Sequence, residues 1–253
     1  MSKFEKRGKA SDYKLKIPSF HCDSPLENVK EPFPSQASFF SVHLAPPKGG
    51  KSSLMVACLA DKNIYKKKFN HVLLVAPDRS MASLKKNIFA DLPENQVYNY
   101  LDGDTLRDIK DQLEGYASND TPENSLLILD DIGAFLKDSD IQKTLQELVF
   151  NRRHLRVSIM LLVQHFMSIP RPIRTMISNM FIFKQSNKKS LETIAQEVMF
   201  FSPQESEDLC NTCFCKPHDF LALNIADNRV FHNLDELFLK NNNMDMYTDG
   251  SQA

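Results

Sequence analysis

The chain of 253 residues contains no apolar run approaching the roughly 18 residues that a membrane-spanning helix needs. Its first residues also lack the apolar core of a secretory signal, so we expect a protein that is not secreted and has no transmembrane segment. Only five cysteines occur, which in this context indicates free thiols in a reducing compartment. Hydrophobic residues make up 42% of the chain, enough to build a substantial core.

A large excess of positive charge is absent as well. The net charge of −1 argues against a surface that is cationic throughout, as a non-specific binder of nucleic acid would have. It is compatible with a local basic patch, or with a ring that gathers a few lysines and arginines at its pore. The first residues form one such patch, which fits a solvated arm as well as a binding arm. Its basic residues are Lys3, Lys6, Arg7, Lys9, Lys14 and Lys16.

Continuous apolar segments alternate with amphipathic ones along most of the chain. We expect strands at residues 38–44, 71–76, 96–100, 125–129, 157–163, 180–183, 220–225 and 229–232. We expect helices over 53–60, around Leu84 and Ile88, from Ser139, around 191–198, and from Ser202. Capping boxes are expected for Ser139 with Gln142 and for Ser202 with Glu205, and Ile141, Leu145, Leu148 and Val149 should share one buried helix face.

This alternation predicts one α/β domain with a mostly parallel central sheet and helices on both faces. Composition divides the chain into three parts. Residues 1–35 are expected to form an N-terminal arm or belt. Residues 36–237 should form the folded domain, and residues 238–253 a flexible polar tail.

The strongest functional motif lies between the expected strand 38–44 and the helix after it. It fits the phosphate-loop pattern G-x-x-x-x-G-K-[ST], except that Ala45 replaces the first glycine. Such a loop points backbone N–H groups at phosphates, its lysine adds charge, and its hydroxyl binds Mg²⁺. An ordinary glycine-rich turn is the alternative. The expected nucleotide-binding residues are Ala45, Pro46, Pro47, Lys48, Gly49, Gly50, Lys51, Ser52 and Ser53.

Two carboxylates end the apolar segment 126–129, about eighty residues after the phosphate loop. Asp130 can bind Mg²⁺ together with Ser52, and Asp131 can act as the base that polarises an attacking water. An aspartate-containing turn is the alternative. The additional strand at 71–76 favours the ATPase class in which a strand is inserted between the two motif strands. Because no guanine-selecting Asn-Lys-x-Asp occurs, we expect ATP as the nucleotide.

Further polar groups follow the expected strand 157–163 or precede it. Gln164 ends that strand and can contact the γ-phosphate or its attacking water, although a structural cap would explain it too. Arg152 and Arg153 can supply charge to a transition state, or merely complement a helix C-terminus. Arg171 and Arg174 are further candidates.

A cluster of Cys210, Cys213, Cys215 and His218 is a weaker signal. Four soft ligands can bind zinc, but here all four lie within nine residues. Zinc sites usually take two pairs of ligands from separate turns, so the spacing argues against a metal site.

In their order and spacing, these motifs resemble one family. The phosphate loop, Asp130-Asp131, Asn151-Arg152-Arg153-His154, Gln164 and the segment 166–174 are similar to the genome-packaging ATPases of poxvirus-like large DNA viruses and their virophage relatives, in the FtsK–HerA branch. The resemblance covers about residues 36–237.

The resemblance implies a homo-oligomeric ring, expected to be a hexamer, that translocates double-stranded DNA into a preformed capsid. Capsid or portal-vertex proteins would be partners, and the protein would be virion-associated or lie in the viral factory of the host cytoplasm. It further implies ATP and Mg²⁺ on Lys51 and Ser52, Mg²⁺ on Asp130, Asp131 as base, Gln164 as γ-phosphate sensor, and an arginine finger. Two alternatives stay open: another P-loop ATPase, such as a helicase loader or protein remodeller, and a nucleotide-locked capsid scaffold that does not hydrolyse ATP.

Overall fold

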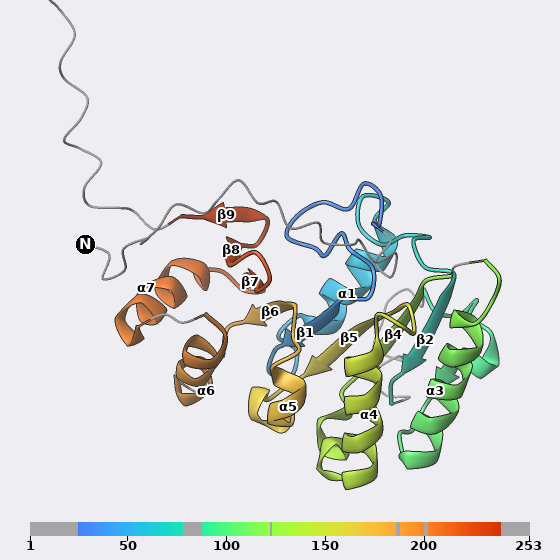
Figure 1. The fold of residues 1–253 in the computed structure, drawn as a ribbon. Helices are drawn as coiled ribbons and strands as arrows, with labels where there is room; N and C mark the ends of the chain where they lie inside the picture. Colours follow the sequence, from blue (N-terminus) through green and yellow to red (C-terminus); the bar gives the residue numbers. More distant parts are fainter. Residues whose placement is uncertain (1–24, 78–87, 122, 186–187, 200–201, 239–253) are drawn as a thin grey trace, which may run out of the picture.

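The computed structural model describes residues 25–77, 88–121, 123–185, 188–199 and 202–238. Within these residues one sheet runs through the molecule in the order β3-β2-β4-β5-β1-β6-β7-β8-β9 (Figure 1). The first six strands in that order are parallel. They are β3 (Val97–Tyr98), β2 (His71–Val75), β4 (Ser125–Asp130), β5 (Val157–Val163), β1 (Phe40–Leu44) and β6 (Asn179–Phe183). The predicted α/β fold with a mostly parallel sheet is confirmed.

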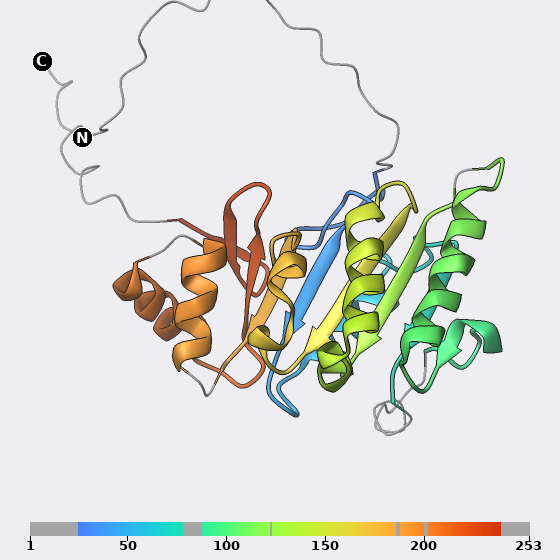
Figure 2. The ribbon, with the colours of Figure 1, turned by 60° about the horizontal axis from the view of Figure 1, so that its bottom comes forward.

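The central strands are buried on both faces, which explains their continuous apolar sequences. Alternate residues of β4 join different cores: Leu127 and Leu129 belong to one cluster, and Leu126 and Ile128 to the other. Helices cover both faces, as predicted. Helix α1 (Lys51–Ala60) packs on the second cluster through Met55 and Cys58. Helices α3 (Gly103–Ala117) and α4 (Ser139–Asn151) pack side by side on the first, seen in front of the sheet in Figure 2.

Helix α4 carries the predicted buried face, because Ile141, Leu145, Leu148 and Val149 are at most 2% exposed. The predicted capping box at its start is wrong. Asp138 is the N-cap, and its carboxylate accepts bonds from the backbone N–H groups of Asp140 (2.9 Å) and Ile141 (3.1 Å). A carboxylate one residue earlier takes the helix N-terminus, where negative charge is favoured. The Gln142 amide instead donates to the carbonyl of Leu136 at 2.7 Å.

An additional strand separates β1 from β4 in the sheet, as the predicted ATPase class requires. This strand is β5, which follows both in sequence, and not β2, which lies on the outer side of β4. Helix α3 was not predicted, although its N-cap Asp102 accepts a bond from the Thr105 N–H at 2.8 Å. The helix expected around Leu84 lies outside the described residues.

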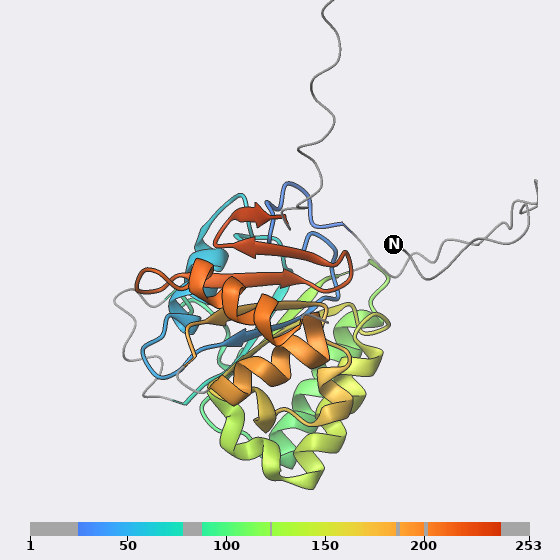
Figure 3. The ribbon, with the colours of Figure 1, turned by 90° about the vertical axis from the view of Figure 1, so that its left-hand side faces the viewer.

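Beyond β6 the strand pairing changes from parallel to antiparallel. After α5 (Arg171–Arg174) and β6, the chain forms α6 (Lys188–Ile194), a π-helical turn (Ala195–Met199) and α7 (Pro203–Cys213). Helix α7 begins with the predicted capping box of Ser202 and Glu205. Strands β7 (Phe220–Asn224), β8 (Arg229–His232) and β9 (Asp235–Leu237) then extend the sheet from β6, each antiparallel to the strand before it, with α6 and α7 beside them (Figure 3). Strand β9 was not predicted.

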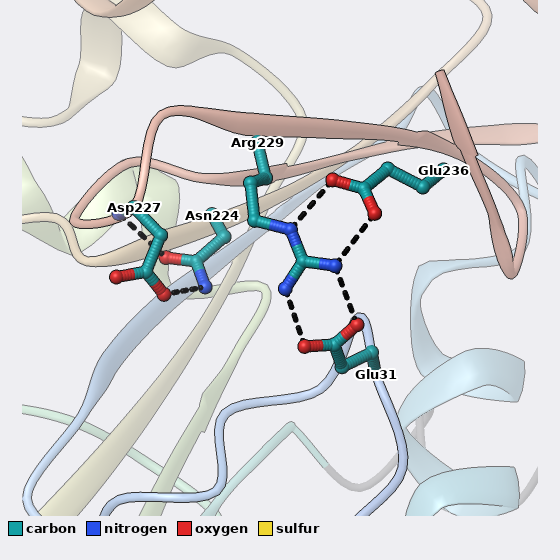
Figure 4. A network of polar contacts seen from close by, with 5 residues as sticks. All are labelled: Glu31, Asn224, Asp227, Arg229 and Glu236. Atoms are coloured by element: carbon teal, nitrogen blue, oxygen red, sulfur yellow. Dashed lines mark hydrogen bonds and ion pairs between the residues drawn. The ribbon is translucent and has the colours of Figure 1, made fainter. Parts of the chain in front are cut away.

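The described part of the N-terminal segment packs against this antiparallel end. Phe33 is 5% exposed and stacks on Phe181 of β6, with ring centroids 5.4 Å apart. Glu31 and Glu236 both bind the guanidinium of Arg229, as Figure 4 shows. The bonds from Arg229 lower the pKa of both carboxyls. Phe33 and Glu31 therefore hold this segment against the antiparallel end of the sheet.

The described helices also bear on membrane insertion. None of them combines the length and the apolar character needed to cross a bilayer.

Candidate active site

The loop between β1 and α1 places its glycines where side chains cannot fit. Gly50 is the N-cap of α1 with φ at 115°, in the left-handed region. A Cβ added to Gly49 would lie 2.9 Å from both the Cβ of Ala45 and the carbonyl oxygen of Pro46. The N-terminus of α1 therefore opens onto tightly folded backbone, which fits an anion such as phosphate.

The same geometry accounts for Ala45. Its side chain is fully buried, and its N–H donates to the carbonyl of Val163 at 3.2 Å. It has no positive φ, so a side chain is tolerated at this position. Its methyl group fills the space that Gly49 leaves open. The departure from the Gly-first pattern is thus compatible with a closed phosphate loop.

Two carboxylates lie across the loop from this backbone. Asp130, the last residue of β4, is 3% exposed and accepts a bond from the Ser52 hydroxyl at 3.0 Å. The Lys51 Nζ lies 3.4 Å from Asp130 Oδ1 and 3.1 Å from Asp131 Oδ1. Asp131 adopts a left-handed conformation, with φ at 56°, and this places both carboxylates on the lysine.

Burial sets the electrostatics of the pair. It raises the pKa of the Asp130 carboxyl, and the charge of Lys51 and the bond from Ser52 offset this only in part. Lys51 is itself only 9% exposed. Keeping the buried Asp130 ionised therefore costs free energy, and a cation placed beside its carboxylate would reduce that cost.

Gln164 comes directly after β5, the strand between β1 and β4. Its side-chain amide donates to Asp131 Oδ1 at 3.0 Å. Because parallel strands end at the same edge, the two aspartates, Gln164 and the phosphate loop meet there. The structure thus brings together Lys51, Ser52, Asp130, Asp131 and Gln164.

The arginines lie elsewhere. The Arg152 guanidinium donates to the carbonyls of Ser38 (2.9 Å) and Val149 (2.8 Å), at the amino edge of the sheet. Arg153 follows it in the same turn, also remote from the phosphate loop. Arg174 pairs with Glu197 at 2.9 Å and donates to the Ile169 carbonyl at 2.9 Å, with a side chain 8% exposed. These contacts of Arg152 and Arg174 therefore lie away from the aspartates.

The residues fit the groups that the sequence implies. The Ser52 hydroxyl and an Asp130 carboxylate oxygen converge within 3.0 Å, and such oxygens suit Mg²⁺, which keeps several waters and takes few protein ligands. Sequence reasoning missed two neighbours of the loop. Phe183 lies against Gly50, and His218 Nδ1 lies 3.4 Å from the Gly49 carbonyl. In the sequence, the only feature that pointed to the segment around His218 was the cluster of cysteines to which it belongs.

Comparison with known proteins identifies the family. A sequence model of the family described as "Poxvirus A32 protein" matches residues 49–232, well over half of the chain. The chain belongs to the poxvirus A32 protein family. The matched region includes both aspartates and Gln164, and the resemblance predicted from sequence is confirmed. No curated protein sequence matches the chain.

Solved structures give the fold of this A32 family member. The B204 DNA-packaging ATPase from Sulfolobus Turreted Icosahedral Virus is similar with a TM-score of 0.59 and 14% identity, over 79% of this chain and 98% of that chain. The genome packaging NTPase B204 from Sulfolobus turreted icosahedral virus 2, in complex with ATP-gammaS, gives 0.58 and 14%, over 79% and 98%. EssC from Geobacillus thermodenitrificans gives 0.55 and 11%, over 88% and 46%. The family and the shared fold confirm the predicted class of P-loop ATPase.

Substitution in the phosphate loop tests the account of Ala45. We expect Gly49→Ala to weaken ATP binding by at least about tenfold, since the new methyl group would clash with Ala45 and with the Pro46 carbonyl. Ala45→Gly should keep the affinity within about twofold, because it removes only a packing methyl group. Isothermal titration calorimetry measures both. A tenfold loss in Ala45→Gly with normal binding by Gly49→Ala would contradict the account.

A pH series tests the strain on Asp130. An acid whose folded-state pKa is raised destabilises the folded protein above that pKa and has no such effect below its unfolded pKa. We therefore expect Asp130→Asn to raise the thermal unfolding midpoint of the nucleotide-free protein at pH 7.5. The gain should shrink as the pH falls into the carboxyl range. Lys51 keeps Asp131 as a partner in this variant. A lower midpoint at pH 7.5 would show that the pair stabilises the fold.

Proposed function

We propose that the chain is a motor that couples ATP hydrolysis to the movement of double-stranded viral DNA into a preformed capsid. The observation that carries this proposal is the meeting of Lys51, Ser52, Asp130, Asp131 and Gln164 at one edge of the sheet, in a member of the A32 family. The structures of B204, a DNA-packaging ATPase in one virus and a genome packaging NTPase in the other, support the same activity.

Each group has a proposed role. The loop 45–53 binds the phosphates of ATP through its backbone, and Lys51 reaches the outer ones. Ser52 and Asp130 hold Mg²⁺, which when bound neutralises charge on the outer phosphates. Asp131 accepts the proton of the attacking water. Gln164, bonded to Asp131, orients that carboxylate and senses the γ-phosphate.

The distances suggest why hydrolysis would begin only after ATP has bound. Asp131 pairs with Lys51 at 3.1 Å, so the ammonium group occupies its carboxylate in the nucleotide-free protein. When Lys51 turns to the phosphates of ATP, that pairing is lost and Asp131 keeps its bond from Gln164. The carboxylate oxygen that Lys51 leaves can then contact the attacking water.

We further propose that subunits form a homo-oligomeric ring, with six as the expected number. In a head-to-tail ring one face of a subunit meets a different face of the next. Arg153 lies at the amino edge, opposite the phosphate loop, and would enter the neighbouring site. Arg152 has the structural role of binding the Ser38 and Val149 carbonyls. Capsid or portal-vertex proteins complete the partners, and the protein would be virion-associated or lie in the viral factory.

Hydrolysis assays test the motor function. We expect double-stranded DNA to stimulate steady-state ATPase activity, and Lys51→Ala to abolish both the basal and the stimulated rate. A DNA triplex-displacement assay should show ATP-dependent movement along the duplex. Stimulation by single-stranded DNA or by a protein alone would instead indicate a helicase loader or a remodeller. Tight ATP binding without turnover would indicate a nucleotide-locked scaffold.

Mixing variants tests the arginine. Arg153→Ala should lower kcat about 10³-fold, the scale typical of an arginine finger, while ATP binding is retained. Mixing inactive Lys51→Ala and Arg153→Ala subunits should restore part of the activity, because some interfaces then combine an intact lysine with an intact arginine. Arg152→Ala should lower thermal stability. Absence of recovery in mixed rings of confirmed assembly would contradict a role in trans.

A further inference from the structure

A hollow lies beside the phosphate loop on the side away from the aspartates. Its volume is about 410 Å³, within the range of small-molecule sites. Pro46, Lys48 and Gly49 line one wall, and the loop 214–219 between α7 and β7 lines the other. Phe183, at the end of β6, lies between them. A smaller hollow on Gly50, Ser53 and Leu54 shares Phe183 and His218 with it.

The strand order indicates on which side of the phosphate loop the nucleoside of a bound nucleotide lies. Asp130 ends β4 and Gln164 follows β5, both on one side of β1, whereas Phe183 ends β6 on the other side. In the proposed function the outer phosphates lie towards Asp130. The nucleoside therefore leaves the phosphate loop on the β6 side, where the hollow lies.

The lining has the chemistry of a stacking site. Phe183 and Phe214 are 3% and 8% exposed, so each presents only part of its ring to the hollow. The His218 ring is exposed and faces the same space, with Pro217 before it. Flat apolar and aromatic surfaces of this kind bind heterocyclic bases by stacking.

The loop 214–219 is held in place before any ligand arrives. The Lys216 N–H donates to Asp219 Oδ2 at 2.7 Å, and the Asn233 amide after β8 donates to Asp219 Oδ1 at 3.1 Å. His218 sits in the left-handed region, with φ at 67°, and its Nδ1 lies 3.4 Å from the Gly49 carbonyl. A Cβ on Gly50 would lie 2.9 Å from the Phe183 ring. Phosphate loop and hollow are thus in direct contact.

The cysteines of this segment make local contacts. Across the described ranges no three histidine, cysteine or acidic side chains are grouped as a metal site would require. The Cys215 thiol lies 3.3 Å from the Asn211 carbonyl and donates to it, and burial raises the pKa of Cys213 to about 11.

We propose that Phe183, Phe214, Pro217 and His218 form a base cradle that stacks the purine ring of the nucleotide bound at the phosphate loop. The assignment rests on the proposed function, since it needs a nucleotide on that loop. The proposal gives His218, the last residue of the Cys/His cluster, a role in recognising the nucleoside.

Two ligands separate the cradle from the phosphate loop: a non-hydrolysable ATP analogue, and tripolyphosphate, which has no base. We expect His218→Asn and Phe214→Leu to weaken the analogue about tenfold in calorimetry of the full chain, and to change tripolyphosphate affinity less than twofold. Asparagine tolerates the left-handed backbone of residue 218, and leucine keeps the bulk of Phe214 in the core. Phe150→Leu, an exposed phenylalanine on α4, is the matched control and should change neither affinity.

The outcomes are distinct. Unchanged affinity for the ATP analogue in both cradle variants would overturn the assignment, with the proposed function intact. Equal weakening of both ligands would also overturn it, because the variants would then act through the phosphate loop. Failure of the unaltered chain to bind either ligand would refute the proposed function and the cradle with it.

Discussion

The ammonium group of Lys51 is the interaction on which the site depends. It lies within 3.4 Å of Asp130 and 3.1 Å of Asp131, so one buried cation separates two neighbouring carboxylates. Without it, two ionised groups this close would repel, and Asp130 would lose its main compensation for burial. The lysine also belongs to the phosphate loop. Any anion that draws Lys51 away must therefore change the contacts of both aspartates, which couples anion binding at the loop to the two carboxylates.

The parallel sheet makes that coupling possible. Lys51 begins the helix after β1, Asp130 ends β4 with Asp131 next to it, and Gln164 directly follows β5, which lies between β1 and β4. These residues are far apart in sequence, but parallel strands bring their carboxyl ends to one edge. Leu162 is paired with Asp130, and the Asp131 N–H donates to the Leu162 carbonyl at 3.1 Å. Strand β5 thus holds the turn that places Asp131 on the lysine, and it supplies the amide that contacts the same carboxylate.

Sequence predicted those features whose signals are local. Buried parallel strands are continuous apolar runs, and a phosphate loop has a fixed spacing, so the central strands and the residues of the site could be placed. The failures have physical reasons. Ser139 was predicted as the N-cap of α4, but the preceding Asp138 takes that position in the folded backbone. The position of β5 between β1 and β4 is a property of the sheet and has no local signal. Phe33 is buried because Phe181, far away in sequence, lies opposite it.

The antiparallel end of the sheet shows why part of the site escaped prediction. The loop 214–219 reaches the phosphate loop because β7 pairs with β6 and the turn after β8 fixes Asp219 through Asn233. His218 is 169 residues from Gly49 in sequence, yet its ring lies 3.4 Å from that glycine's carbonyl. Gly50 adds a second contact between the phosphate loop and β6, since any side chain at this position would clash with Phe183. A glycine that sequence assigns to phosphate binding is therefore also required by its contact with an aromatic ring. The phosphate loop and the antiparallel strands constrain one another, and a change in either must alter the shape of the hollow between them.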